Sequence, residues 1–313
     1  MDLEKGAERI VNQCLDIGSD ESVVIVDDGN DPDIIEALRS VTERKAGSLE
    51  YREYPEPDTS GTEPPEDVAE AMKSSDVFIA PTVKSISHTQ ARVDANKAGA
   101  RGATLPGVNK EIWTGSLQAD YSRIEEISQK AFSFLEEGQK IRIETPSGTD
   151  LEFKVRMDSF FTDTGIIHEP GDFGNLPAGE VHGGVIEMNG TLVIDHFPHA
   201  DSGTEVVIEN SQVVEVKGES KLKDAMEDEC VRNIAEFGFG TNPEATLIGK
   251  TLQDEKVLGT VHIAFGDNTH YFPEDHERYN PCSVHWDAVC ESPTVWLGEE
   301  KMLDRGKPVF LEK

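Results

Sequence analysis

The sequence has few basic residues and no long hydrophobic run. It contains 29 Lys and Arg residues against 61 Asp and Glu residues, and the formal net charge is −32 over 313 residues. Nucleic acids and anionic lipid surfaces are themselves negatively charged, so this balance excludes them as main partners. No segment approaches the roughly 18 consecutive apolar residues that a membrane-spanning helix needs. We therefore expect a soluble protein whose partner is a small-molecule or peptide substrate or a second copy of the chain.

Cysteine is also scarce, which excludes a disulfide framework or a cysteine-rich metal site. No two of the four cysteines form a C-x-x-C pair; they are Cys14, Cys230, Cys282 and Cys290. We expect all four to be reduced thiols. Residues 1–15 alternate charged and apolar side chains at helical spacing, without the basic segment and apolar run of a signal peptide. These features predict a cytoplasmic protein.

The first part of the chain alternates strand-like and helix-like segments. Residues 22–28 (SVVIVDD) and 76–82 (DVFIAPT) are short apolar runs, and residues 32–46 between them have helical periodicity. This order predicts an α/β fold with a doubly wound parallel sheet, Rossmann-like, over residues 1–135. Neither a G-x-G-x-x-G motif nor a phosphate-binding lysine follows the first strand, so we expect a structural or substrate-capping domain that binds no nucleotide.

Short β-type runs separated by Gly, Asn and Asp follow from residue 140 onward. Residues 183–196, 204–218 and 256–266 alternate or carry turn residues, and residues 221–237 interrupt them with a helical pattern. We therefore assign a β-rich α+β domain, with mixed or antiparallel sheets, to residues 136–313.

Seven of the nine histidines follow residue 180, and the sharpest local pattern is His285-Trp286-Asp287. Residues i and i+2 of a strand share a face, so His285 and Asp287 present an imidazole and a carboxylate side by side. These ligand types suit Zn, Mn, Co or Fe. In residues 260–266, apolar side chains alternate with His262, which places His262 away from the core. Taken alone, the first pattern also fits an exposed surface pair and the second a hydrogen-bonded core histidine.

Two glutamates lie in apolar or glycine-rich surroundings. Glu180 lies in NLPAGEVHGG and Glu236 in NIAEFGFGTNP. Glutamate is seldom buried without a partner, and neighbouring glycines let another group approach the backbone closely. Both are therefore candidate site residues, and His182 is a weaker candidate on the same face as Glu180.

Several blocks occur in a recognisable order between residues 77 and 300. They are ISHTQARVDANKAGARGATLPGV, ADYSRI, SGTDLEF, GNLPAGEV, AEFGFGTNP, DEKVLGTVHIAFGDN and HWD. Together they resemble the M29 metallo-aminopeptidases (aminopeptidase T, or thermophilic aminopeptidases) and their shorter relatives, which include the iron-dependent 2,5-dihydroxypyridine dioxygenase. The resemblance implies metal ligands at Glu180, Glu236, His262, His285 and Asp287. It also implies that Tyr271 or His270 lies near the site and that the chain forms a homodimer.

The leading hypothesis is an aminopeptidase that hydrolyses N-terminal peptide bonds at a centre of two divalent ions, Zn, Co or Mn. In it, the three carboxylates supply the charge and the two histidines the nitrogen ligands, while Glu180, Tyr271 and His88 are the candidate catalytic residues.

The alternative is a ring-cleaving dioxygenase with one Fe(II), acting on a dihydroxylated aromatic such as 2,5-dihydroxypyridine. In it, His262, His285 and Asp287 form a two-histidine, one-carboxylate triad. The groups that handle substrate or protons would then be Glu180, Glu236, His182 and His88. The chain is shorter than typical M29 peptidases and has His-Gly-Gly after Glu180, which brings it closer to the shorter relatives. A metal-binding or peptide-binding protein without catalytic activity is a third hypothesis.

The acidic excess is spread along the whole chain, which predicts a halophilic surface. Crowded carboxylates repel one another, and cations screen them over a Debye length of about 3 Å at 1 M salt against about 10 Å at 0.1 M. The melting temperature measured by calorimetry should therefore rise from low to molar KCl. A constant melting temperature over this range would contradict the prediction.

Overall fold

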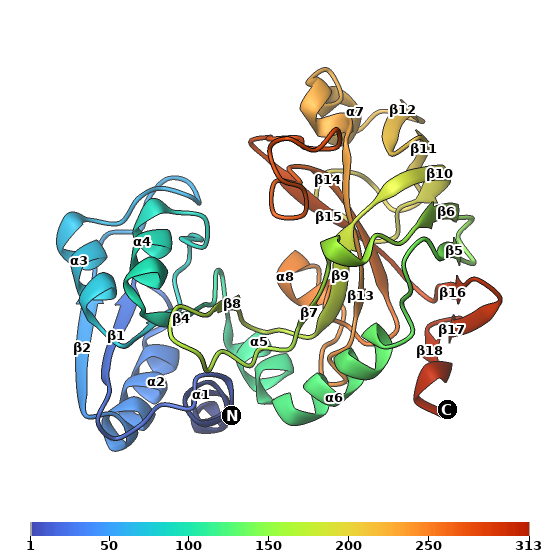
Figure 1. Ribbon diagram of the computed structural model, residues 1–313. Coiled ribbons are helices and arrows are strands. Elements are labelled where there is room, and N and C mark those ends of the chain that lie inside the picture. Colours follow the sequence, from blue (N-terminus) through green and yellow to red (C-terminus); the bar gives the residue numbers. More distant parts are fainter. Residues whose placement is uncertain (1, 313) are drawn as a thin grey trace. The chain divides into compact units, whose positions relative to one another are not determined.

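The computed structural model describes residues 2–312, which divide into two compact units (Figure 1). The first comprises the described residues up to Glu125 together with Thr164–Ala178. The second comprises Glu126–Asp163 and the described residues from Gly179 onward. Among the described residues, no helix has both the length and the apolar character that a membrane crossing requires.

The first unit is built on a five-stranded sheet in which every neighbouring pair is parallel. In spatial order its strands are β2 (Ser48–Glu53), β1 (Ser22–Asp27), β3 (Val77–Ala80), β4 (Arg101–Thr104) and β8 (Phe173–Asn175). Its helices are α1 (Leu3–Arg9), η1 (Ile10–Cys14), α2 (Pro32–Lys45), α3 (Glu66–Ser74), α4 (Gln90–Ala98), α5 (Lys110–Thr114) and η2 (Ser116–Gln118), and α6 (Tyr121–Phe132) continues into the second unit.

A buried arginine anchors the N-terminal segment to this sheet. The guanidinium of Arg101 donates hydrogen bonds of 2.6 and 2.7 Å to the two carboxylate oxygens of Glu21, and of 3.0 and 2.8 Å to the carbonyl of Leu15. The hydrogen bond from Arg101 lowers the pKa of Glu21. Arg101 therefore connects the start of β4 to the chain that precedes β1.

The second unit contains two antiparallel sheets (Figure 1). The eight-stranded sheet has the spatial order β12 (Gln212–Val216), β11 (Glu205–Glu209), β10 (Ile186–Val193), β6 (Asp150–Lys154), β5 (Lys140–Glu144), β16 (Thr294–Leu297), β17 (Glu300–Asp304) and β18 (Lys307–Pro308). The five-stranded sheet has the order β15 (His285–Cys290), β14 (Val261–Gly266), β13 (Ile234–Gly240), β9 (Glu180–Gly184) and β7 (Phe160–Asp163).

The core of this unit lies between the two sheets. The rings of Phe153 on β6 and Phe237 on β13 pack with their centroids 4.9 Å apart, and both side chains are buried. Ile263 and Phe265 of β14 belong to the same hydrophobic cluster. The expected α/β fold, with a parallel sheet followed by a β-rich part, is therefore confirmed.

The prediction of a helix over residues 221–237 is wrong for the second half of this segment. Helical structure is limited to α7 (Lys221–Ala225) and a 3-10 turn at Glu229–Arg232, and β13 begins at Ile234. β13 is the central strand of its sheet and is paired with β14 on one side and β9 on the other. These two ladders override the local helical pattern, as tertiary context commonly does.

Replacing Arg101 by Met should lower the free energy of unfolding by about 3–5 kcal/mol, because it leaves the Glu21 carboxylate without its partner. The pKa of Glu21 is lower in the folded protein than in the unfolded chain. The ion pair therefore stabilises the wild type fully at pH values above the unfolded pKa of a glutamate. This stabilisation is lost as the pH falls through the folded pKa. Urea unfolding at neutral and acidic pH measures both effects. The exposed Lys97→Met is the control, and an Arg101→Met as stable as this control would contradict the prediction.

Candidate metal centre

One face of the five-stranded sheet carries the side chains singled out by the sequence. Directly opposed residues of neighbouring strands share a face, and the register places Glu236 beside Ala264 and Ala264 beside Asp287. The other three candidates lie beside glycines of the adjacent strand, Glu180 beside Gly240, His262 beside Gly238 and His285 beside Gly266. The sheet therefore brings five residues together from four strands.

Two glycines of β13 leave room for these groups. A Cβ atom on Gly238 would lie 2.2 Å from Nε2 of His262, and a Cβ on Gly240 would lie 2.2 Å from the carbonyl oxygen of Val257. No side chain fits at such distances, so both positions require glycine. The imidazole of His262 consequently lies directly against Gly238 of β13.

Glu236 lies at the middle of the cluster and contacts three histidines. Its Oε1 atom lies 3.2 Å from Nε2 of His262 and 3.3 Å from Nδ1 of His182. Its Oε2 atom lies 2.9 Å from Nε2 of His285. Because Glu236 is 5% exposed, these contacts replace the water that a carboxylate would otherwise bind.

The remaining two carboxylates lie on either side of Glu236. Nε2 of His262 lies 3.4 Å from Oε2 of Glu180, and Nε2 of His285 lies 3.5 Å from Oδ1 of Asp287. Two groups of potential metal ligands result, and they share Glu236. One consists of Glu180, Glu236 and His262, and the other of Glu236, His285 and Asp287.

The charges of these side chains depend on one another. Burial alone would raise the pKa of Glu236, but the hydrogen bonds from His182, His262 and His285 lower it well below its usual value. Burial alone would lower the pKa of His262, but Glu236 and Glu180 raise it to about 9. The Glu236 carboxylate is therefore stabilised as an anion by proton donors within the cluster.

The residues present fit a divalent metal ion. Among the described residues, neither Oε2 of Glu180 nor Nδ1 of His262 has a hydrogen-bond partner, although both atoms are buried. A buried carboxylate oxygen without a hydrogen bond is costly, and a cation would remove that cost. Carboxylate oxygens and imidazole nitrogens are the ligand types of Zn, Mn, Co and Fe sites.

Aromatic rings lie next to this cluster. The hydroxyl of Tyr271 lies 2.6 Å from Nδ1 of His182, and the ring of His270 is stacked on that of His182 at 6.4 Å. The resemblance placed Tyr271 or His270 near the site, and both rings lie beside His182. Phe161 of β7, which the sequence did not single out, lies 5.5 Å from the ring of His270 and is 40% exposed. A phenylalanine in a four-residue strand carried no signal of this position.

A buried lysine contacts the cluster from one side. Nζ of Lys256 lies 2.5 Å from Oε1 of Glu180, 2.8 Å from Oε1 of Glu255 and 3.9 Å from Oδ2 of Asp163. Burial raises the pKa of Glu255 to about 8, against the opposing charge of Lys256. Sequence reasoning missed this residue, because a lysine within DEKVLG is typical of a solvated loop.

His88 belongs to the first unit, whereas the cluster belongs to the second. Its expected role with substrate or protons stays a prediction.

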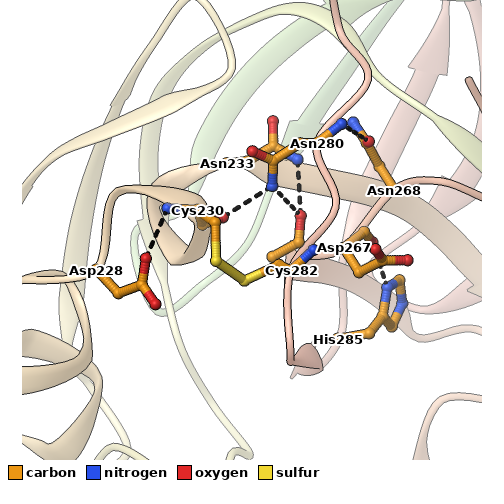
Figure 2. Close-up of a disulfide and its surroundings, with 9 residues drawn as sticks. Asp228, Cys230, Asn233, Asp267, Asn268, Asn280, Cys282 and His285 are labelled. Carbon is orange, nitrogen blue, oxygen red and sulfur yellow. Dashed lines mark hydrogen bonds between the residues drawn. A yellow bond between two sulfur atoms is a disulfide. The ribbon is translucent and has the colours of Figure 1, made fainter. Parts of the chain in front are cut away.

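The expectation of four reduced thiols is wrong for two cysteines. Cys230 and Cys282 form a disulfide across a sequence separation of 52 residues (Figure 2). Cys14 and Cys290 are buried thiols outside this disulfide. The folded chain brings the Cα atoms of the pair to 5.5 Å, within the range that a disulfide spans. Spacing along the sequence gave no indication of this approach.

The disulfide lies beside a segment that orients one candidate ligand (Figure 2). The backbone amide of Cys282 donates to a carboxylate oxygen of Asp267 at 3.1 Å, and Nδ1 of His285 lies 2.7 Å from the carbonyl oxygen of Asp267. A carbonyl only accepts, so Nδ1 carries a proton, and Nε2 is the ring nitrogen that faces the cluster. This is the arrangement of a histidine that ligates through Nε2.

The ligand assignment predicts that His262→Ala and Asp287→Ala each lower the amount of bound metal, because each removes a ligand atom. Metal content after reconstitution and desalting, measured by mass spectrometry, tests this. His168→Ala, in the first unit, is the matched control and should keep the wild-type content. If both site variants retain wild-type metal content, the assignment is wrong.

The chain is similar to known proteins over almost its whole length. A family model described as NicX, 2,5-dihydroxypyridine 5,6-dioxygenase, matches residues 16–310. The structure of a 2,5-dihydroxypyridine dioxygenase from Pseudomonas putida KT2440 superposes with a TM-score of 0.77 at 18% identity, covering 98% of this chain and 96% of that one. Wild-type AmpT from Thermus thermophilus superposes with a TM-score of 0.69 at 20% identity, covering 98% and 99%. No curated protein sequence matches this chain.

Proposed function

The chain belongs to the 2,5-dihydroxypyridine 5,6-dioxygenase family, and from this premise we propose that it is a metal-dependent dioxygenase that cleaves a dihydroxylated aromatic ring. The observation that carries the proposal is the family match over residues 16–310. It covers all the strands that bear the candidate centre. A 2,5-dihydroxypyridine-like diol is the proposed substrate class.

The residues that would hold the metal are His262, His285 and Asp287. Two histidines and one carboxylate are the ligand set of non-haem Fe(II) oxygenases. A ferrous ion held by such a set supplies open coordination positions for dioxygen and an aromatic diol. The contact between Nδ1 of His285 and the Asp267 carbonyl fixes the tautomer and orientation of one ligand.

In this proposal, Glu236 and His182 are the groups that handle protons. A diol gives up hydroxyl protons when it reacts as a dianion or monoanion, so basic atoms are needed beside it. Oε1 of Glu236 and Nδ1 of His182 lie 3.3 Å apart, and Nδ1 of His182 also lies 2.6 Å from the hydroxyl of Tyr271. Burial raises the pKa of Tyr271 well above its usual value, so this hydroxyl keeps its proton. In this proposal, Tyr271 orients His182 and the carboxylate accepts the proton.

The rings beside the centre suit a flat aromatic substrate. Phe161 is one of the few large apolar side chains that are exposed among the described residues, and its ring lies 6.2 Å from that of His182. Offset or edge-on contacts between rings at such spacings are favourable. The exposed face of Phe161 is thus a candidate surface for the ring of the substrate.

An aminopeptidase with two Zn, Co or Mn ions is the second candidate. The observation that favours it is the position of Glu236, which belongs to both ligand groups. A carboxylate between two ions is the arrangement of two-metal hydrolases. A homodimer and a cytoplasmic location stay predictions under either function.

The two candidates predict opposite results in two assays. The wild type reconstituted with ferrous iron should consume oxygen with 2,5-dihydroxypyridine, measured with an oxygen electrode, because the diol is the proposed substrate class. With Zn, Co or Mn it should not hydrolyse aminoacyl-p-nitroanilides. Asp287→Ala should be inactive in the oxygen assay, which controls for oxidation of the diol by free iron. Amide hydrolysis without oxygen uptake would overturn the dioxygenase and support the aminopeptidase.

A further inference from the structure

Lys256 is a buried ammonium within a cluster of carboxylates. It is 3% exposed, and its three carboxylate partners are Glu180, Glu255 and Asp163. Its shortest contact, 2.5 Å, is to Oε1 of Glu180, which is a member of one of the two potential ligand groups. The other oxygen of the same carboxylate faces Nε2 of His262. One carboxylate thus lies between Lys256 and His262.

The backbone around Lys256 is fixed against the end of β13. The amide of Asn242 donates to the carbonyl of Lys256 at 2.9 Å, and the amide of Leu258 donates to the carbonyl of Asn242 at 3.1 Å. Gly240 lies directly beneath, because a Cβ there would be 2.5 Å from the carbonyl carbon of Lys256. Gly240 is also the cross-strand partner of Glu180. Backbone hydrogen bonds and the close approach to Gly240 therefore hold Lys256 next to Glu180.

The position of the ammonium bears on the number of metal ions that the cluster can accept. The group formed by Glu180, Glu236 and His262 has the composition of a metal site, but Lys256 already neutralises Glu180. A divalent ion bound there would share a carboxylate with an ammonium, and like charges repel strongly in a buried site of low dielectric constant. The other group, Glu236, His285 and Asp287, has no lysine or arginine among the ion-pair partners found in the described part of the chain.

We infer that Lys256 takes the place of a second metal ion and thereby limits the centre to one divalent ion. Lys256 is then a positioning residue that holds Glu180 and leaves His262, His285 and Asp287 to a single ion. This inference rests on the metal site of the proposed function but not on its substrate, so it is tested by metal binding without any activity assay.

The experiment is a titration of metal-free full-length protein with Mn²⁺, followed by calorimetry and by metal analysis of the desalted protein. The wild type should bind one equivalent. Lys256→Met should bind a second equivalent, about tenfold or more tighter than any second ion in the wild type, because removal of the ammonium leaves Glu180 as a free ligand. Lys256→Arg keeps the charge and should bind one equivalent. The double variant Lys256→Met/Glu180→Gln should lose the second equivalent.

The exposed Lys301→Met is the matched control and should bind as the wild type does. If Lys256→Met unfolds without metal, its circular dichroism during the Mn²⁺ titration gives the same answer, because refolding should saturate at two equivalents. Two equivalents in the wild type, or one in a folded Lys256→Met, would overturn the inference and leave the metal site itself standing. A wild type that binds no metal would overturn the metal site of the proposed function, and the inference with it.

Discussion

The burial of several carboxylates on one face of a sheet is the constraint on which the rest of the second unit depends. Glu180 and Glu236 are 6% and 5% exposed, and an unpaired buried carboxylate is too costly to keep its charge. Three histidines and Lys256 provide the compensating contacts. These contacts in turn require the glycines of β13, because the imidazole of His262 and the backbone at Lys256 can approach this strand only where it has no Cβ atom.

Successive side chains of β13 point to opposite faces of the sheet, so that one face packs in the core and the other carries the candidate centre. Phe237 points into the core and packs against Phe153 of the other sheet, whereas Glu236 and Gly238 face the candidate centre. A shift of one residue in register would exchange these two faces, which would bury Glu236 in the core. Pairing with β14 and β9 on both sides holds the register, so the fold and the centre are specified by the same hydrogen bonds.

Strand periodicity predicted part of the site because its signal is local. His285 and Asp287 are two residues apart on β15, and His262 alternates with Ile263 and Phe265 on β14, so an extended backbone alone orients them. Glu236 was singled out by its glycine-rich surroundings although its strand was assigned to a helix. That error arose because a single sequence shows the helical spacing of residues 221–237 but not the two ladders that extend β13.

The features that the sequence did not predict are all products of long-range contacts. Cys230 meets Cys282, and Lys256 meets Glu180, only after strands distant in the chain are paired. The three-residue strand β8 joins the sheet of the first unit although it follows β7 of the second, and so short a segment has no measurable periodicity. Residues of ordinary local appearance therefore acquire their roles from the tertiary structure.

The long-range contact between Lys256 and Glu180 changes the charge of the cluster, and this charge affects whether the cluster binds one metal ion or two. A shared carboxylate such as Glu236 is compatible with either number, because it can bridge two ions or accept protons beside one. Glu180 discriminates between them, since the same residue can bind a metal ion or an ammonium but gains little from a second cation once the first is in place. The ammonium of Lys256 lies 2.5 Å from that carboxylate. The chemistry available to the centre is thus set by a residue that need contact neither the metal nor the substrate.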